Sequence, residues 1–218
     1  MKIKVINRSM ENKNGEIFQP FSPKIGKFKL SDKIVDEINT HVDNIIKDDV
    51  LSSKLDHGKN LAGQVTQEIK LTEEFISKGL LSELANATKA FIYGCENVNI
   101  SSFNLISSWV VRQFKNEYNP VHWHGGHISG VAYLKIPKKL TETGSKKHID
   151  RNGNIEFIHG NRLFLSSSTF TVTPEVGDLY IFPHYLMHTV YPFYAEGERR
   201  SVSFNSFIDD KIFKVHNN

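Results

Sequence analysis

Three histidines have the residue type and the spacing that suit a metal ion. His122 and His124 are separated by one residue, and His188 lies further along the chain. Side chains two apart on a β-strand point to the same face, so two imidazoles at this spacing form half of a metal site. Alone the pair is a weak signal, because two surface histidines on an exposed edge would look the same. His188 strengthens the metal-site hypothesis, because it follows an expected strand at 178–182 through the turn at Pro183.

A second group of residues has chemistry that suits a carboxylate. Residues 199–205 alternate between two sets of side chains. If Val202 and Phe204 pack against helices, Arg199 and Ser201 face the other way, into the interior of a barrel. An arginine can hold a carboxylate through two parallel hydrogen bonds, with a serine hydroxyl beside it. The alternative is that Arg199 and the next arginine form a basic pair on the surface.

The elements that must position these residues are predicted from hydrophobic periodicity and turn signals. Strands are expected at 2–6, as two or more short strands within 98–114, and at 131–136, 155–158, 163–165, 169–172, 178–182 and 200–208. One helix begins at Ser31 or Asp32, and a second begins at Thr72 and ends with Gly94 as its C-cap. Many short strands after two helices predict a mainly β fold, a sandwich or barrel with helices on one outer face.

The length and composition favour a single soluble domain. The 218 residues are expected to form N-terminal strands and supporting helices at 1–97, and a β-rich core with the metal site at 98–218. The single cysteine, Cys95, cannot form an intramolecular disulfide, which fits a reducing compartment. No apolar run approaches the roughly 20 residues that span a bilayer, and residues 1–6 are too short for a signal peptide. We expect a cytoplasmic protein that does not contact membranes.

The charge distribution gives little support for nucleic-acid binding. The formal net charge is +3, and the Lys and Arg residues do not cluster among aromatic residues. The short lysine pairs at 138–139 and 146–147 are expected to lie in a solvated loop.

The order of the motifs resembles that of the iron(II)- and 2-oxoglutarate-dependent oxygenases. The motifs are His122-Trp123-His124, Ser129-Gly130-Val131 with Tyr133-Leu134, Gly177-Asp178-Leu179 with Phe182-Pro183, His188-Thr189-Val190, and Arg199 with Ser201, Ser203, Phe204 and Asn205. The pattern looks most like an oxygenase subfamily common in marine bacteria and their phages, which has His-x-His where prolyl hydroxylases have His-x-Asp. The resemblance covers residues 100–208 and implies a double-stranded β-helix, or jelly-roll, core with supporting helices.

The resemblance also implies a ligand set and a reaction. His122 and His188 would bind Fe(II), and His124 would occupy the position of the usual carboxylate ligand. The implied reaction uses O₂ and 2-oxoglutarate to hydroxylate a substrate, and it releases succinate and CO₂. Ascorbate is a candidate reductant. Arg199 would pair with the distal carboxylate of 2-oxoglutarate, with Ser201 beside it.

Alternatives remain open at both the carboxylate site and the metal site. Tyr133 could add a hydroxyl contact to the same distal carboxylate. Three neutral imidazoles leave the iron site one charge more positive than the usual two histidines and one carboxylate. His127, on the irregular turn after His124, is an alternative ligand, and His184 is another. Both are expected near the site or on the surface rather than on the metal.

Other interpretations of the same motifs compete with the oxygenase hypothesis. Cupins also place His-x-His early and a histidine late, but they have a glutamate three or four residues after the second histidine. The stretch 125–129 contains none. A non-catalytic structural or binding protein of phage type on the same fold is a second rival. Three histidines and a water would also suit Zn(II).

Substrate choice is expected to depend on residues outside the motifs. Candidate substrates are a peptidyl proline, another side chain, a free amino acid or a nucleotide, and prolyl hydroxylation is the nearest analogy. A peptide or protein partner is therefore expected, and a homodimer is compatible with the sequence. The stretch 138–172 and a long loop at 50–70 are expected to determine the substrate. The aromatic residues that could line the mouth of the site are Trp109, Trp123, Tyr118 and Tyr185. Trp123 lies between two expected ligands and is expected to point away from the metal.

Overall fold

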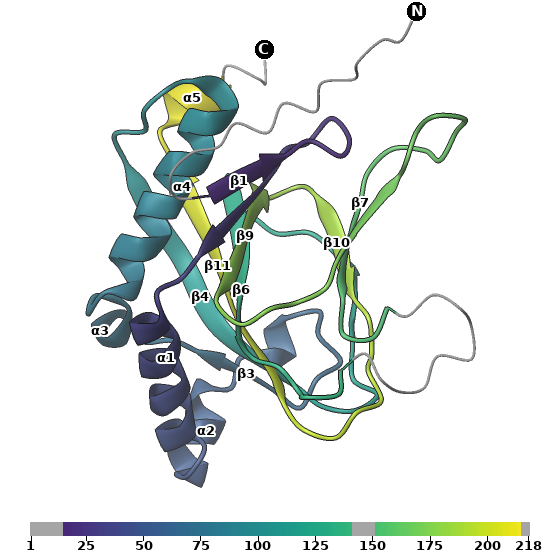
Figure 1. Ribbon diagram of the computed structural model, residues 1–218. Helices are drawn as coiled ribbons and strands as arrows, with labels where there is room; N and C mark the ends of the chain where they lie inside the picture. The colour runs from purple at the N-terminus through teal and green to yellow at the C-terminus, as the bar shows by residue number, and fades with distance from the viewer. Residues whose placement is uncertain (1–14, 141–150, 215–218) are drawn as a thin grey trace, which may run out of the picture.

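The computed structural model describes residues 15–140 and 151–214, which form two antiparallel β-sheets with helices on one side (Figure 1). The strands are β1 (Gly15–Phe18), β2 (Ile25–Lys29), β3 (Gln67–Lys70), β4 (Phe103–Gln113), β5 (Asn119–His122), β6 (Ile128–Lys135), β7 (Ile155–Ile158), β8 (Thr169–Val172), β9 (Asp178–Pro183), β10 (Met187–Val190) and β11 (Arg199–Ile208). The helices are α1 (Asp32–Ile45), α2 (Asp49–Leu55), the 3-10 turn η1 (Gly58–Asn60), α3 (Glu73–Ile76), α4 (Leu80–Glu96) and α5 (Asp210–Lys214). The expected strand at 2–6 lies outside the described residues. The mainly β architecture with supporting helices is confirmed.

The larger sheet carries the long strands. Its order is β1-β2-β9-β6-β11-β4-β3, so β11 lies between β4 and β6 and pairs with both. The smaller sheet has the order β5-β10-β7-β8 and lies against the other face of the larger one. Strands from the first part of the chain, β1 to β3, form both edges of the larger sheet.

Helix α1 begins at Ser31, as expected, because the Ser31 hydroxyl accepts a hydrogen bond from the Ile34 backbone N–H. The second helix differs from the prediction. Thr72 caps only the short α3, and Gly79 then adopts φ +154°, which no right-handed helix can include. The longer α4 starts after this glycine. It ends at Asn97, whose left-handed backbone forms the C-cap instead of Gly94.

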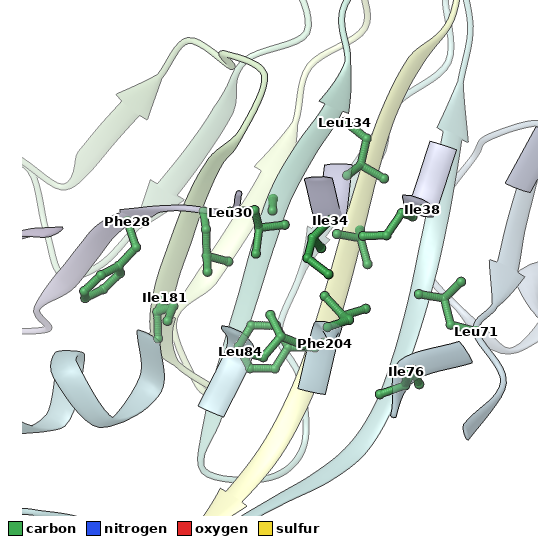
Figure 2. Close-up of a cluster of buried hydrophobic side chains, with 14 of the residues drawn as sticks. Phe28, Leu30, Ile34, Ile38, Leu71, Ile76, Leu84, Leu134, Ile181 and Phe204 are labelled. Atoms are coloured by element: carbon green, nitrogen blue, oxygen red, sulfur yellow. The ribbon is translucent and has the colours of Figure 1, made fainter. Parts of the chain in front are cut away.

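A hydrophobic core fills the space between the helices and the larger sheet (Figure 2). Ile34 and Ile38 of α1 and Leu84 of α4 meet Phe204 of β11 and Ile181 of β9 there. Each of these side chains is at least nine-tenths buried, and burying one contributes about 1.5–3 kcal/mol. This core fixes which face of β11 is turned toward the helices.

Three local expectations are corrected by the structure. The segment 98–114 holds one long strand, β4, because β3 and β11 flank it on both sides. The expected strand at 163–165 is a turn, in which Leu165 has φ +63°. The expected loop at 50–70 contains α2, η1 and β3. Within the described ranges, no helix is long and apolar enough to cross a membrane.

A second hydrophobic cluster lies between the two sheets. Its members come from β2, from β6 to β10 and from the turn between β9 and β10, and they include the fully buried Tyr133, Phe157 and Phe182. The predicted metal-binding histidines lie beside this cluster, since the ring of His188 packs 6.0 Å from that of Phe157 and 5.0 Å from that of Phe182. The two sheets therefore enclose the candidate site.

Candidate active site

Two of the three histidines lie opposite each other on neighbouring strands of the smaller sheet. His122 is the last residue of β5, and its Cα partner on β10 is His188. Their rings are 4.3 Å apart, centroid to centroid. The register of an antiparallel pair brings together residues that the sequence separates widely.

His124 reaches the same point from a loop, although a strand was expected to carry it. It lies two residues beyond the end of β5, and its backbone N–H donates to the carbonyl oxygen of His184 at 3.0 Å. The Nδ1 atom of His184 in turn lies 3.0 Å from the His124 carbonyl oxygen. These two contacts fasten the loop to the chain after β9. The imidazole of His124 then lies against Trp109 of β4, at 5.7 Å between ring centroids.

The three imidazoles form a cluster whose nitrogens converge. One ring nitrogen from each of His122, His124 and His188 lies within 4.8 Å of the others, and the Nε2 atoms of His124 and His188 are 3.2 Å apart. Two nitrogens bound to one ion at about 2.1 Å each, with an angle of roughly 100° between the bonds, would be separated by about this distance. The cluster therefore fits an iron site.

Hydrogen bonds and burial hold the cluster in the neutral form that binds metals. The Nδ1 atoms of His122 and His188 lie 2.7 and 2.9 Å from the carbonyl oxygens of Pro120 and Leu186. Donation from each Nδ1–H leaves the Nε2 lone pair free for an ion. Burial lowers the pKa of all three imidazoles, and that of His124 falls to about 3 because of burial and then of its histidine neighbours.

The two competing histidines lie outside this cluster. The Nδ1 atom of His127 accepts a hydrogen bond from the Ile208 backbone N–H at 3.2 Å, and its ring stacks on Phe213 at 3.8 Å. His184 supports the backbone of His124 instead of joining the three nitrogens. His127 and His184 both line a different pocket, between α4, α5 and β9.

Arg199 lies at the end of the cavity that the larger sheet forms. It is 2% exposed, its Nε donates to the Gly153 carbonyl oxygen at 3.0 Å, and its guanidinium lies 5.1 Å from the centre of the Tyr133 ring. Among the described residues, neither Nη2 of Arg199 nor the Tyr133 hydroxyl has a hydrogen-bond partner of good geometry, although the two groups lie close enough to interact with each other. Burial lowers the pKa of Arg199 and raises that of Tyr133. Two unpaired buried donors fit a carboxylate that would bind both.

Arg200 has a different environment from its neighbour, and a surface basic pair is therefore wrong. Arg200 is also buried, but its guanidinium binds Glu198 at 2.9 Å and Asp43 at 2.7 Å on the helix side of the sheet. Successive side chains of β11 face opposite sides of the sheet. Arg200 is therefore paired on the helix side, whereas Nη2 of Arg199 has no hydrogen-bond partner among the described residues.

One cavity joins the histidine cluster to Arg199. Its volume is about 260 Å³, and Ser201 and Ser203 line it beside Arg199 on the inner face of β11. All three histidines line it too. The cavity can therefore hold a small molecule with a carboxylate at Arg199 and metal-binding atoms at the histidines.

Several lining residues differ from the expectation. Trp123 was a candidate for the mouth that was expected to point away from the metal, and it lines the cavity while remaining 66% exposed. Trp109, also expected at the mouth, lines the cavity as a buried side chain. Tyr185 lines the other pocket instead. Glu68 of β3 and residues 60–62 also line the cavity. They lie in the stretch 50–70, which was expected to determine the substrate, but no motif marked them individually.

The chain resembles a known protein family over the stretch that forms the site. Residues 107–205 match the model of a protein family described as "Putative 2OG-Fe(II) oxygenase". The matched stretch contains the three clustered histidines, Tyr133 and Arg199. A comparison with curated proteins finds no significant match.

Solved structures of similar fold include three prolyl hydroxylases. A prolyl-4-hydroxylase from Pseudomonas putida is 14% identical, with a TM-score of 0.52 over 83% of this chain and 91% of that one. A viral collagen prolyl hydroxylase from Paramecium bursaria Chlorella virus-1, in complex with 2-oxoglutarate, is 15% identical, with a TM-score of 0.52 over 84% and 94%. A prolyl hydroxylase from Trichoplax adhaerens, in complex with a peptide fragment, is 14% identical, with a TM-score of 0.53 over 88% and 86%. At these identities the likeness establishes the jelly-roll fold.

The stretch that matches the family contains the histidine cluster and Arg199. The three neutral imidazoles fit Fe(II), and the two unpaired donors fit a carboxylate of 2-oxoglutarate. Over residues 107–205 the chain is therefore similar to the iron(II)- and 2-oxoglutarate-dependent oxygenases, and this match supports a 2-oxoglutarate-dependent dioxygenase.

Proposed function

We propose that this oxygenase hydroxylates a side chain of a peptide or protein. In this proposal His122, His124 and His188 bind the iron. Arg199 binds the distal carboxylate of 2-oxoglutarate, with hydroxyl groups of Tyr133 and Ser201 beside it. The products besides the hydroxylated substrate are succinate and CO₂.

The observation that carries the proposal is the pair of unpaired donors at the closed end of the cavity. A buried polar group without a partner costs about 1–3 kcal/mol, and more when it is charged. Nη2 of Arg199 and the Tyr133 hydroxyl both lie in this position. A carboxylate between them would satisfy both, and 2-oxoglutarate is the dicarboxylate that the family uses.

The chain's own residues bind and orient the reactants. When bound, iron(II) with 2-oxoglutarate supplies the oxidant that attacks a substrate C–H bond. The Nδ1–H groups of His122 and His188 fix the orientation of two ligands, and the cavity between the sheets keeps bulk water away. Arg199 holds the cosubstrate at the end opposite the metal, so its reactive end faces the histidines.

The choice of a peptide substrate rests on fold analogy and on the rim of the cavity. One structure of similar fold is a prolyl hydroxylase in complex with a peptide fragment. In this chain, the exposed Trp123 lies at the rim, and the apolar Val121 beside it is 52% exposed. Exposed aromatic side chains next to a cleft are typical of peptide contacts.

The first experiment measures binding of iron and 2-oxoglutarate. Under anaerobic conditions, Fe(II) and 2-oxoglutarate should give a weak visible charge-transfer band with the wild-type protein. Arg199→Met should raise the Kd of 2-oxoglutarate, followed by this band, by at least about thirtyfold, because losing one partner of a buried charge pair costs about 2 kcal/mol or more.

Arg162→Met is the matched control, since Arg162 is exposed in the turn after β7. Arg200→Met is unsuitable, because it would leave the buried Glu198 with one partner fewer. Absence of the band in the wild type, or an unchanged Kd in Arg199→Met, would contradict the proposed site. Succinate formation with candidate peptides then identifies the substrate.

A further inference from the structure

Glu68 is a carboxyl group inside the cavity that the proposed iron and 2-oxoglutarate sites do not use. It lies on β3, the edge strand of the larger sheet, where its Cα partner on β4 is Val111. Both residues line the same cavity as the histidine cluster. Arg199 lies two strands away on β11, so Glu68 faces the site from the edge of the sheet and Arg199 faces it from an interior strand.

The Glu68 carboxyl is buried, and one of its oxygens has no partner among the described residues. The residue is 1% exposed, and in the described part of the chain its Oε2 has no hydrogen-bond partner and neither oxygen has an ion pair. A charged carboxylate buried without a partner is strongly unfavourable. A structural glutamate would be expected to have bonds that justify its burial, so this group is better explained by a ligand.

The loop that covers Glu68 does not neutralise it. A Cβ atom added to Gly63 would lie only 3.0 Å from Oε1, so the loop passes close to the carboxyl, yet no N–H of the described loop donates to it. The loop instead brings a second acidic group, Asp56, whose Oδ1 accepts from the backbone N–H groups of Gly58 and Glu68. Burial, with the charge of Asp56 adding to it, raises the pKa of Glu68 to about 7.

The position of Glu68 relative to the metal cluster follows from the sheet register. Trp109 is two residues before Val111 and faces the same cavity, so it is the diagonal neighbour of Glu68, at roughly 7–8 Å. The Trp109 ring lies 5.7 Å from the ring of His124. The Trp109 side chain thus lies between Glu68 and the histidine cluster. A substrate bound at Glu68 through one group would extend across this ring to reach the metal.

We propose that Glu68 selects the substrate by binding a positively charged group, an ammonium or guanidinium, on the side chain to be oxidised or beside it. This inference rests on the proposed function and specifies its substrate class. The negative charge of the Glu68 carboxylate, with no cation paired to it among the described residues, favours a cation over a neutral donor. The face of Trp109 favours a cation as well, since aromatic rings attract cations through their π electrons.

The experiment uses intrinsic fluorescence, because the only two tryptophans of the chain, Trp109 and Trp123, both line the cavity. Two blocked tripeptides, Gly-Lys-Gly and Gly-norleucine-Gly, differ in one charge at nearly equal size. They are titrated into the full-length protein with Fe(II) and 2-oxoglutarate under anaerobic conditions. The wild type should bind the lysine peptide at least about tenfold more tightly, and an arginine and citrulline pair should show the same sign.

Glu68→Gln keeps the shape but removes the charge, and it should reduce this preference to less than about threefold. Glu68→Asp keeps the charge on a shorter side chain and should retain a preference for the lysine peptide. Glu73→Gln, at an exposed site on α3, is the matched control and should behave as the wild type. Thermal unfolding confirms that each variant is folded.

The outcomes separate this inference from the proposed function. If the wild type gives the charge-transfer band but binds the two peptides equally, the role of Glu68 is wrong and the oxygenase site stands. A preference that persists in Glu68→Gln would also overturn it. If the band itself is absent, the proposed function fails first.

Discussion

Arg199 and Arg200 show how much depends on the direction of one side chain. They are adjacent and almost equally buried, but Arg200 is paired with Glu198 and Asp43, whereas Arg199 keeps a free donor in the cavity. Strand alternation predicted which arginine faces the interior. The sequence could not show that Arg200 is buried too, because its acidic partners come from α1 and from the turn before β11.

Glu68 should make the stability of the protein depend on pH. Its pKa rises from the ordinary 4.5 to about 7 in the folded state, so between these values the folded protein binds the proton more tightly than the unfolded chain. The free energy of unfolding should therefore fall as pH rises from 4.5 to 7 and level off above. Each pKa unit corresponds to about 1.4 kcal/mol, so the rise from 4.5 to about 7 sets an upper bound of about 3.5 kcal/mol on the loss, which solvent screening reduces.

Glu68→Gln should remove this part of the pH dependence and be more stable than the wild type at pH 8. The measurement is urea denaturation at pH 5 and pH 8, with Glu73→Gln as the reference. A variant that gains no stability at pH 8 would mean that Glu68 has a compensating partner in solution. A gain in stability together with a loss of peptide selectivity is expected of a functional residue that destabilises the fold.

At the scale of the element, one face of β11 packs against the helices and the other face lines the cavity. Val202 and Phe204 face the helical core, and Arg199, Ser201 and Ser203 face the cavity. The alternating pattern in the sequence was sufficient to predict this division, because it follows from the pleat of a strand. The core contacts then fix the register that presents Arg199 to the cosubstrate.

Substitutions on the two faces of β11 should have opposite effects. Phe204→Ala should lower the free energy of unfolding by about 3–5 kcal/mol through the cavity it creates. The protein that remains folded should bind 2-oxoglutarate normally. Ser201→Ala should cost little stability but raise the Kd of 2-oxoglutarate by roughly tenfold, the loss of one hydrogen bond to a charged group. Urea denaturation and the charge-transfer titration measure the two quantities, and equal effects on both would contradict the division.

Other elements were less predictable, for physical reasons. The break at Gly79 was missed because the apolar periodicity of α3 continues into α4 and hides it. His124 was expected on a strand, but its place depends on the contacts with His184, which comes from a distant part of the chain. The spacing therefore predicted the correct residues and the wrong local structure.

The whole molecule depends on pairings that only the tertiary fold reveals. β3 pairs with β4 across more than thirty intervening positions, and this pairing alone brings Glu68 into the cavity. No motif could have indicated it. The sequence was informative where chemistry is concentrated in short motifs, and it was silent where one residue enters the site from a sheet edge.

The enclosure of the cavity by two sheets has a consequence for the length of the cosubstrate. His122 and His188 belong to the smaller sheet and Arg199 to the larger one, so the spacing between the sheets sets the span from metal to guanidinium. Packed sheets resist changes in this spacing. The site should therefore select among 2-oxo diacids by the length of their carbon chain. Oxaloacetate, one methylene shorter, and 2-oxoadipate, one longer, should each compete with 2-oxoglutarate at least about tenfold more weakly, because one methylene in a fitted pocket is worth about 1–3 kcal/mol. Equal competition by all three acids would show that the sheets adjust to their ligand.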